Sequence, residues 1–272
     1  MSTVTSRDGT TIGFDRTGSG PPVILVDGAL CHRRFGPAGP LAAQLAGHFT
    51  VYTYDRRGRG DSGDTAPYAP EREVDDLEAL LREAGGSAYL YGISSGAVLA
   101  LDAAARLDGV RRLAVYEAPF VVDDSHPARP DDYLERMEAL VAADRRSAAV
   151  ARFMRTVGVP AVGVAVMWLT PAWKKLKAVA HTLPYDFRIL GDTGSGRPLP
   201  ADRWAGATQP TLSMDGGKSP GYLRNGMRAL AEVLPDARHR SLAGQTHLLK
   251  PEAVAPVLVE FFGSDVGADR TG

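Results

Sequence analysis

The 272-residue chain has little of three features that would narrow its function at once: cysteine, net charge and long apolar runs. Its single cysteine, Cys31, excludes an intrachain disulfide and gives no reason to expect an oxidising compartment. The formal net charge of −1 gives no reason to expect nucleic acid or an anionic membrane as a partner. Residues 1–20 lack the apolar segment of a signal peptide, and no apolar run reaches the length of about 18 residues that a membrane-spanning helix needs. The default expectation is a cytoplasmic protein.

Segments with the pattern of strands alternate with helical segments along most of the chain. Residues 22–26 form a continuous apolar run that suits a strand buried on both faces. Residues 70–84 have apolar side chains at helical spacing, and residues 3–17 have the pattern of a hairpin around Asp8-Gly9. The alternation predicts a mostly parallel sheet with helices on both faces. Further strands are expected at 49–54, 88–91, 112–116, 210–214 and 239–242, and further helices at 41–46, 96–105, 222–233 and 251–262.

Residues 122–208 interrupt this alternation, and they are longer than a connection between two strands needs. They have helical stretches at 133–143, 148–156 and 172–183 and predict a helical cap, with an ordinary pair of packing helices as the alternative. The predicted division is a core of residues 1–121 and 209–263, a cap of residues 122–208 and a flexible tail of residues 264–272. Four apolar residues of the insertion could line a substrate cavity or form the cap's own core: Phe153, Met167, Trp168 and Trp173.

One motif points to covalent catalysis. Gly92-Ile93-Ser94-Ser95-Gly96 lies between an expected strand and an expected helix. In a nucleophile elbow the serine occupies a strained strand-to-helix turn, and small flanking residues let the backbone fold tightly so that the hydroxyl projects outward. The helix N-terminus below it favours the negative charge that develops. Ser94 is therefore the candidate nucleophile, with a tight turn and a capping serine as the alternative. Ser95 has the wrong spacing to the glycines, and its N–H suits an oxyanion donor.

With three further segments, this motif makes the chain resemble the α/β-hydrolase superfamily from the first hairpin to Phe262. Val26-Asp27-Gly28-Ala29 lies where that family has His-Gly-x, and residues 55–62 resemble its D-x-R-G-x-G-x-S segment. Gly244-Gln245-Thr246-His247 resembles the G-x-x-H that carries the catalytic histidine. The resemblance implies the serine-nucleophile branch of the family and its α/β-hydrolase fold. That fold has an eight-stranded, mostly parallel sheet with helices on both faces and a helical cap inserted after the sixth strand.

A serine hydroxyl is a weak nucleophile at neutral pH and needs a base within hydrogen-bond reach. Among six histidines, His247 follows the last expected strand and fits the chain order of serine, acid and histidine. His239 lies in the polar run Arg238-His239-Arg240, which predicts a solvated strand position. His32 follows the expected oxyanion loop closely and is a second pocket candidate. His247 is therefore the expected base.

The acid that would orient His247 is not at the family's usual place. The pattern after the seventh strand puts Ser219 where many relatives have aspartate, and a serine cannot supply the negative charge that stabilises an imidazolium. Glu117, at the end of the sixth expected strand, is the preferred acid. Its strand-end position and its Tyr-Glu-Ala setting resemble some haloalkane dehalogenases of this fold. Asp215, at the end of the seventh strand, is the alternative acid. The non-catalytic alternative for Glu117 is a strand-end residue paired with an arginine of the cap.

The resemblance also implies an oxyanion hole formed by the backbone N–H groups of Ala29 and Ser95. The sequence departs from the family by having Asp27 in place of the usual histidine and Ile93 where a polar residue is common. An ionised carboxylate would oppose negative charge at this place. Asp27 therefore either turns away to bind backbone N–H groups or marks a pocket for other chemistry. The candidate substrate-binding residues are Asp27, Leu30, Met167 and Trp168.

These residues predict a hydrolase that needs no cofactor and cleaves a carboxylic ester, lactone or thioester of a small molecule through an acyl-Ser94 intermediate. No metal site is predicted, since Cys31 has no Cys/His spacing around it. A non-hydrolytic tailoring enzyme (cyclisation, elimination or C–C cleavage) and a non-catalytic ligand-binding protein are the alternatives. The arginine-rich residues 56–59 are expected to form local ion pairs with the interleaved aspartates rather than bind phosphate. The Ala-, Arg- and Gly-rich composition resembles that of high-GC bacteria, and the oligomeric state is not predicted.

Overall fold

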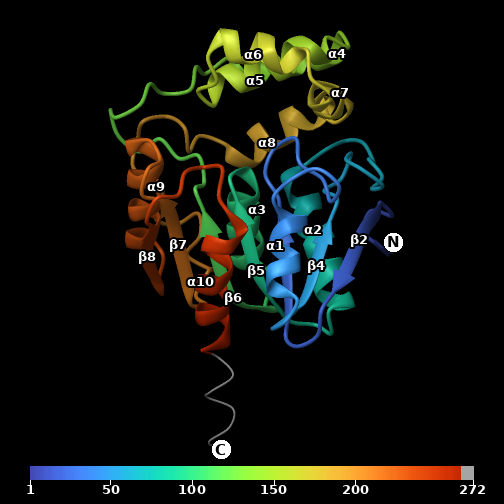
Figure 1. Cartoon of the computed structure of the whole chain (residues 1–272), viewed down its shortest axis with the longest axis vertical. Helices are drawn as coiled ribbons and strands as arrows, with labels where there is room; N and C mark the ends of the chain where they lie inside the picture. The colour runs from blue at the N-terminus through green and yellow to red at the C-terminus, as the bar shows by residue number, and fades with distance from the viewer. Residues whose placement is uncertain (265–272) are drawn as a thin grey trace, which may run out of the picture.

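Eight strands form one sheet in the order β1-β2-β4-β3-β5-β6-β7-β8 in the computed structural model, which describes residues 1–264 (Figure 1). β1 and β2 form the expected antiparallel hairpin, and every pair from β4 to β8 is parallel. The eight-stranded, mostly parallel sheet predicted above is therefore confirmed. The strands are β1 (Ser2–Thr5), β2 (Thr11–Thr17), β3 (Pro22–Val26), β4 (Thr50–Tyr54), β5 (Ala88–Ile93), β6 (Val110–Tyr116), β7 (Thr211–Gly216) and β8 (Ala237–Leu242).

Helices cover both faces of the sheet. α1 (Ala38–Leu45) and α10 (Pro251–Gly263) pack on one face, and α2 (Pro70–Glu83), α3 (Ser95–Ala104) and α9 (Gly221–Val233) pack on the other. The central strand β5 is buried along its whole length, because helices cover both faces of the sheet. Two apolar clusters, one on each face, hold the layers together.

Parallel pairing brings the carboxyl ends of the central strands to the same edge of the sheet. Val26 of β3 pairs with Gly92 of β5, and Ile93 pairs with Tyr116 of β6. Tyr116 in turn pairs with Met214 of β7. The residues that follow these strands therefore form a row along one edge, where α/β sheets bind their ligands.

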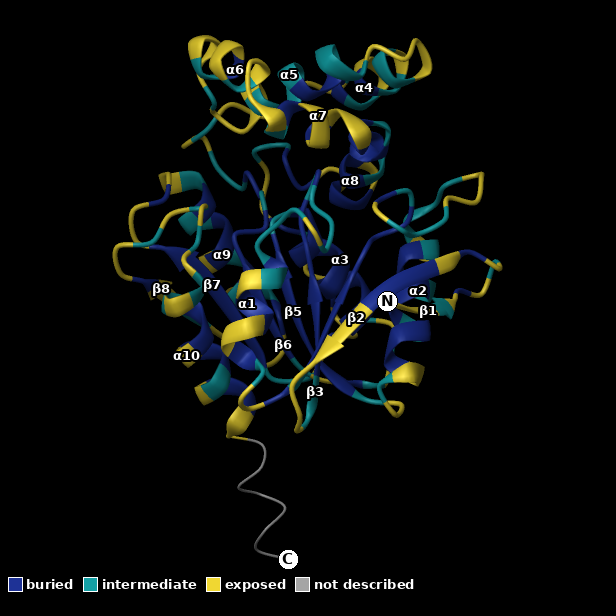
Figure 2. Cartoon of the chain, turned by 45° about the vertical axis from the view of Figure 1, so that its right-hand side comes forward, coloured by how far each residue is buried: buried dark blue, intermediate teal, exposed yellow. Residues whose placement is uncertain are grey.

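The inserted segment, residues 122–208, lies above this edge and between β6 and β7 (Figure 1). It contains α4 (Tyr133–Ala142), α5 (Arg146–Thr156), α6 (Ala161–Trp168), α7 (Pro171–Ala178), the short 3-10 helix η1 (Ala180–Thr182) and α8 (Leu183–Leu190). Of these, α8 packs directly on α3 and α2. Figure 2 shows that the central strands β3, β4, β5 and β7 are buried, whereas α6 is largely exposed.

Two features of the inserted segment differ from the sequence prediction. The single helix expected at 172–183 is broken into α7, η1 and α8. Pro184 lies in the first turn of α8, where its missing N–H is tolerated, whereas it would disrupt the interior of a longer helix. The helix α6 was not expected, because its residues are apolar all round and therefore lack the amphipathic spacing that marks a helix packed on a core.

Two further observations concern the C-terminal residues and the length and hydropathy of the helices. Apart from Ser264, the flexible tail predicted at 264–272 lies outside the described residues. Within residues 1–264, no helix has both the length and the apolar character required to cross a bilayer.

Candidate active site

Ser94 occupies the sharp turn between β5 and α3. Its backbone angles are φ 57° and ψ −128°, a region that residues other than glycine rarely adopt and that costs on the order of 1–3 kcal/mol. Four described non-glycine residues have positive φ, and three of them, Leu30, Ser94 and Glu117, directly follow or lie near strand ends at this edge. The side chain of Ser94 is partly exposed, and its hydroxyl forms no hydrogen bond with another residue of the described chain. The hydroxyl is therefore available to a ligand.

The turn depends on close backbone contacts at Gly92 and Gly96. A Cβ on Gly92 would lie 2.5 Å from the carbonyl oxygen of Gly96, and a Cβ on Gly96 would overlap the carbonyl oxygen of Val26. Both distances are far below van der Waals contact, so a side chain at either position would force β5, α3 and β3 apart. Gly28 lies against the serine itself, since its Cβ would be 2.9 Å from the Cβ of Ser94. The glycines of the motif thus allow the packing that exposes Ser94.

The side chain of His247 contacts the carboxylate of Glu117. The Nδ1 atom of His247 lies 2.8 Å from Oε2 of Glu117. Glu117 is fully buried, whereas the imidazole is 41% exposed. The other carboxylate oxygen, Oε1, accepts a hydrogen bond of 2.7 Å from the N–H of Gly216. Both oxygens of this buried carboxylate are therefore satisfied, and one of them fixes the ring nitrogen that faces away from solvent.

The sheet brings Glu117 next to Ser94. The N–H of Ser94 donates to the carbonyl of Tyr116 over 2.9 Å, and Glu117 is the next residue after Tyr116. Because Ile93 and Tyr116 are paired in register, the nucleophile candidate and the acid candidate follow neighbouring residues of adjacent strands. His247, held by Glu117, lies at the same edge.

Tyr116 is a supporting residue that sequence reasoning missed. Its hydroxyl donates a 2.8 Å hydrogen bond to the carbonyl of Thr246, the residue before His247. Burial, together with the charges of Glu117 and Asp215, raises the pKa of the Tyr116 phenol, so the phenol remains a donor. No motif indicated this contact, although a tyrosine directly before the strand-end glutamate was a place to look for it.

Asp215, the alternative acid, has other partners. Its carboxylate contacts Nε2 of His239 and accepts a 2.6 Å hydrogen bond from the hydroxyl of Ser241. Both partners belong to β8, and Asp215 is completely buried. The expectation that His239 is a solvated strand position is wrong, because its ring pairs with this buried carboxylate and is only 22% exposed. The charged run around His239 hid the strand alternation that turns its side chain inward.

The expected oxyanion loop lies beside the serine. Ser95 is the first residue of α3, and the first N–H groups of a helix have no partner within it. Ala29, the other expected donor, is partly exposed and follows Gly28, which touches Ser94. The carboxylate of Asp27 is buried and accepts a backbone hydrogen bond from Ala38 at the start of α1. The side chain therefore points to a helix N-terminus, as turn aspartates often do, rather than to the expected oxyanion site.

The remaining substrate-binding candidates lie in different surroundings. Leu30 is buried in the larger apolar cluster, and its φ of 61° adds strain to the loop after β3. Met167 is partly buried against that cluster. Trp168 is 64% exposed at the end of α6. The structure thus leaves Trp168 mainly in solvent, and a role in substrate binding stays a prediction for all three.

The arginine-rich segment is buried, with Arg56, Arg57 and Arg59 each about 1% exposed. The expectation of local pairs with the interleaved aspartates is wrong. Arg56 pairs with Glu73 and Asp186, Arg57 pairs with Asp76 and Asp8, and Arg59 pairs with Asp186. Two of the interleaved aspartates, Asp55 and Asp61, pair with Arg33 instead. A buried charge requires a partner, and here most of the partners come from α2 and α8.

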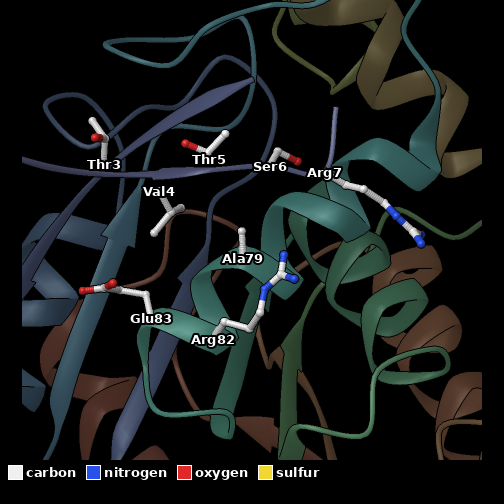
Figure 3. Close-up of a pocket in the computed structure, with 8 residues that line it drawn as sticks. All are labelled: Thr3, Val4, Thr5, Ser6, Arg7, Ala79, Arg82 and Glu83. Carbon is white, nitrogen blue, oxygen red and sulfur yellow. The ribbon is translucent and has the colours of Figure 1, made fainter. Parts of the chain in front are cut away.

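Two other features of the described chain are not part of this edge. A surface depression of about 580 Å³ is lined by residues 3–7 and by Ala79, Arg82 and Glu83. These residues are drawn in Figure 3. The depression contains neither a histidine nor any residue that follows the central strands. Within residues 1–264, no three His, Cys, Asp or Glu side chains are grouped in a way that would hold a metal ion.

The position of Asp27 predicts a pH-dependent stability. Burial raises its pKa from 3.8 to about 7, although the Ala38 hydrogen bond and the charges of Arg59 and Arg56 act in the opposite direction. A raised pKa in the folded state means that the protonated form stabilises the fold, fully below the unfolded value and progressively less as the pH rises through about 7. We expect the unfolding free energy of the wild type, minus that of Asp27→Asn, to fall between pH 4 and pH 7 in urea titrations. A difference that stays constant over this range would contradict the assignment.

The chain is similar to known hydrolases in sequence and in structure. An alpha/beta hydrolase from Sphaerobacter thermophilus DSM 20745 is 54% identical, with a TM-score of 0.88 over 96% of this chain and 100% of that one. The hydrolase YraK of Bacillus subtilis (strain 168) is 39% identical over 101 residues. This match covers 35% of the present chain and only 35% of YraK. A pimeloyl-[acyl-carrier protein] methyl ester esterase of Xanthomonas axonopodis pv. citri (strain 306) is 26% identical over 265 residues, covering 86% of this chain and 90% of that protein.

The sequence model of the alpha/beta hydrolase family matches residues 18–257. This range includes the strand-to-helix turn at Ser94, the buried Glu117 and the loop that carries His247. The match covers most of the sequence, and the Sphaerobacter structure shares more than half of its residues over nearly the whole length. The chain therefore belongs to the alpha/beta hydrolase family.

Proposed function

We propose that the chain is a serine hydrolase that cleaves a carboxylic ester, lactone or thioester of a small molecule. The observation that carries the proposal is the contact between Nδ1 of His247 and the buried carboxylate of Glu117, at the sheet edge that also carries the partly exposed Ser94. A carboxylate on one ring nitrogen leaves the other nitrogen free to take a proton from a serine. The Xanthomonas relative is named as a methyl ester esterase, which supports the choice of an ester.

The first half of the reaction forms an acyl-enzyme. Nε2 of His247 removes the proton from the Ser94 hydroxyl as its oxygen attacks the carbonyl carbon of the substrate, and the carbonyl oxygen becomes an oxyanion. The tetrahedral intermediate then collapses, the bond to the leaving alcohol or thiol breaks, and His247 gives its proton to that group. Ser94 carries the acyl group at the end of this step.

The second half returns the enzyme to its starting state. His247 removes a proton from a water molecule, whose oxygen attacks the acyl carbon, and the carboxylic acid leaves as Ser94 regains its proton. Glu117 remains ionised throughout, holds the imidazole in one orientation and stabilises its positive charge. The N–H of Gly216, which donates to the second oxygen of Glu117, keeps that carboxylate in place.

The oxyanion is proposed to bind the N–H groups of Ala29 and Ser95. Each such preset donor contributes about 3 kcal/mol to the stability of the transition state. Asp27 does not oppose this role, since its carboxylate is turned to the start of α1 and burial raises its pKa to about 7. The orientation of Asp27 therefore removes the main reason for preferring a non-hydrolytic reaction.

The inserted segment is proposed to act as a cap that limits access of water and shapes the substrate pocket. Its position above the edge that carries Ser94 supports this role (Figure 1). The proposed boundaries are 122–208 for the cap and 1–121 with 209–263 for the core. The cytoplasmic location expected from the sequence stays a prediction.

An activated serine should react with a fluorophosphonate probe. We expect the folded wild type to be labelled on the peptide that contains Ser94, because His247 makes this hydroxyl nucleophilic. Ser94→Ala should lose labelling and should lose ester hydrolysis by on the order of a thousandfold or more. Labelled peptides identified by mass spectrometry provide the measurement. If Ser94→Ala were still labelled at the wild-type rate, Ser94 would not be the nucleophile.

The two acid candidates can be separated by matched neutral variants. We expect Glu117→Gln to lower the rate of acylation by p-nitrophenyl acetate by on the order of 10³ to 10⁴, since the imidazole loses its orienting charge. Asp215→Asn should retain acylation within a few-fold, because Asp215 contacts His239 and Ser241 rather than His247. Burst kinetics measure both rates. The opposite outcome, in which only Asp215→Asn abolishes the burst, would rule out Glu117 as the acid.

A further inference from the structure

Asp186 of α8 has a place that the proposed reaction does not explain. Its side chain is 1% exposed and reaches from the inserted segment to Ser95, the first residue of α3. Oδ1 accepts a 2.7 Å hydrogen bond from Arg56 and another of 2.7 Å from the hydroxyl of Ser95, and Oδ2 accepts one of 2.7 Å from Arg59. Burial by itself raises the pKa of this carboxyl, but the charges of Arg59 and Arg56 and the Ser95 hydroxyl outweigh burial and lower it.

The two arginines that hold Asp186 also hold the loop after β3. Arg59 donates to the carbonyl of Gly28 over 2.7 Å, and Arg56 lies 3.4 Å from the carbonyl of Asp27. Arg56 is itself fixed by both oxygens of Glu73, at 2.7 and 2.9 Å. The carbonyl of Gly28 and the N–H of Ala29 belong to the same planar peptide unit. Arg59 therefore holds the unit that carries the first expected oxyanion donor.

The second expected oxyanion donor, the N–H of Ser95, is also linked to the carboxylate of Asp186. The hydroxyl of Ser95 donates to Asp186, and the backbone N–H of Ser95 belongs to the same residue. Ser95 directly follows Ser94 in the strained turn. A single buried carboxylate from the inserted segment is therefore linked to both sides of the expected oxyanion hole, to one through Ser95 and to the other through Arg59.

We propose that Asp186 is a positioning residue through which the cap sets the geometry of the oxyanion hole. This inference rests on the proposed serine hydrolase function and adds a specific role for the inserted segment. With α8 seated, Asp186 fixes Ser95 and neutralises the two arginines that fix the loop of Gly28 and Ala29. The cap thereby takes part in stabilising the transition state, in addition to covering the substrate.

Two variants separate positioning from charge. Asp186→Asn keeps the size of the side chain but leaves the buried charges of Arg56 and Arg59 without their shared partner. These positive charges would favour an oxyanion, so their net effect partly opposes the loss of geometry. Ser95→Ala removes only the hydroxyl and leaves all charges and the backbone N–H in place. A fall in rate in Ser95→Ala therefore reports on geometry alone.

We expect kcat for p-nitrophenyl acetate to fall about tenfold or more in Asp186→Asn and about fivefold in Ser95→Ala, since a displaced donor loses part of the stabilisation that it gives the oxyanion. KM should change less than about twofold in both, because a small ester makes little use of the oxyanion hole in its ground state. The affinity for a trifluoromethyl ketone, which forms a tetrahedral adduct with the serine, should fall in parallel with kcat. The double variant should be no slower than Asp186→Asn alone, because both changes act through the same contact between residues 186 and 95.

Arg188→Gln provides the matched control. Arg188 is on the same helix, is 43% exposed and pairs with Glu138, and it has no hydrogen bond with Ser95 or with the arginines that hold Asp186 in the described chain. This variant should keep kcat and inhibitor affinity within about twofold of the wild type. Circular dichroism identifies any variant that does not fold.

The outcomes separate the two proposals. The positioning role would be overturned if the wild type is active and the folded Asp186→Asn and Ser95→Ala variants keep its kcat and ketone affinity, even if their melting temperatures are lower. That result would leave the serine hydrolase proposal intact. If Asp186→Asn does not fold, the Ser95→Ala result decides in the same way. A wild type that neither hydrolyses esters nor reacts with fluorophosphonate would overturn the proposed function, and the inference would fail with it.

Discussion

The close contact between the backbones of β3, β5 and α3 is the constraint on which the candidate active site depends. A side chain at Gly92 or Gly96 would overlap neighbouring backbone, and Ser94, in the turn between these glycines, has a positive φ. That strain is offset by the buried strands and the apolar helix on either side. A hydroxyl on a strained, rigid turn has little freedom to move away from its reaction partner, which is the form of preorganisation that nucleophilic catalysis needs.

The charged side chains around this turn differ in how far they are buried. Glu117 is buried with both oxygens engaged, whereas the imidazole that it contacts is partly exposed. Below and beside the turn, the arginines of the segment after β4 are buried with carboxylates from α2 and α8. Buried pairs of this kind contribute little net stability compared with apolar packing, but they fix geometry, because displacing one member leaves an unpaired charge. At this edge they link the loop after β3, the start of α3 and α8 into one network.

Much of the fold could be predicted from the sequence, because it is encoded in local patterns. The apolar run of β3 and the amphipathic spacing of α2 gave their positions within a residue or two. The short helix α6 could not be predicted, since its residues are apolar on every side and only Val164 is buried. The break between α7 and α8 was missed because it depends on Pro184. Proline is tolerated in the first turn of a helix but disrupts a helix interior, so the residue alone does not tell which of the two applies.

The site was less accessible to sequence reasoning, because its contacts join residues that are far apart in the chain. Ser94 and His247 could be proposed from local motifs, and Glu117 from its place at a strand end. The contacts of Tyr116 with Thr246 and of Asp186 with Ser95 join residues 130 and 91 positions apart. No local pattern encodes such pairs. The pairing of His239 with Asp215 was missed for the same reason, since two strands had to be placed in register first.

The most direct test of the account is to trap the acyl-enzyme. The protein is mixed with p-nitrophenyl acetate, quenched with acid during the burst and digested for mass spectrometry. We expect an acetyl group on Ser94 that appears with the burst of p-nitrophenol and disappears when the substrate is exhausted. Turnover of the ester with acetylation at another residue, or with no acetylated protein at any time, would contradict it.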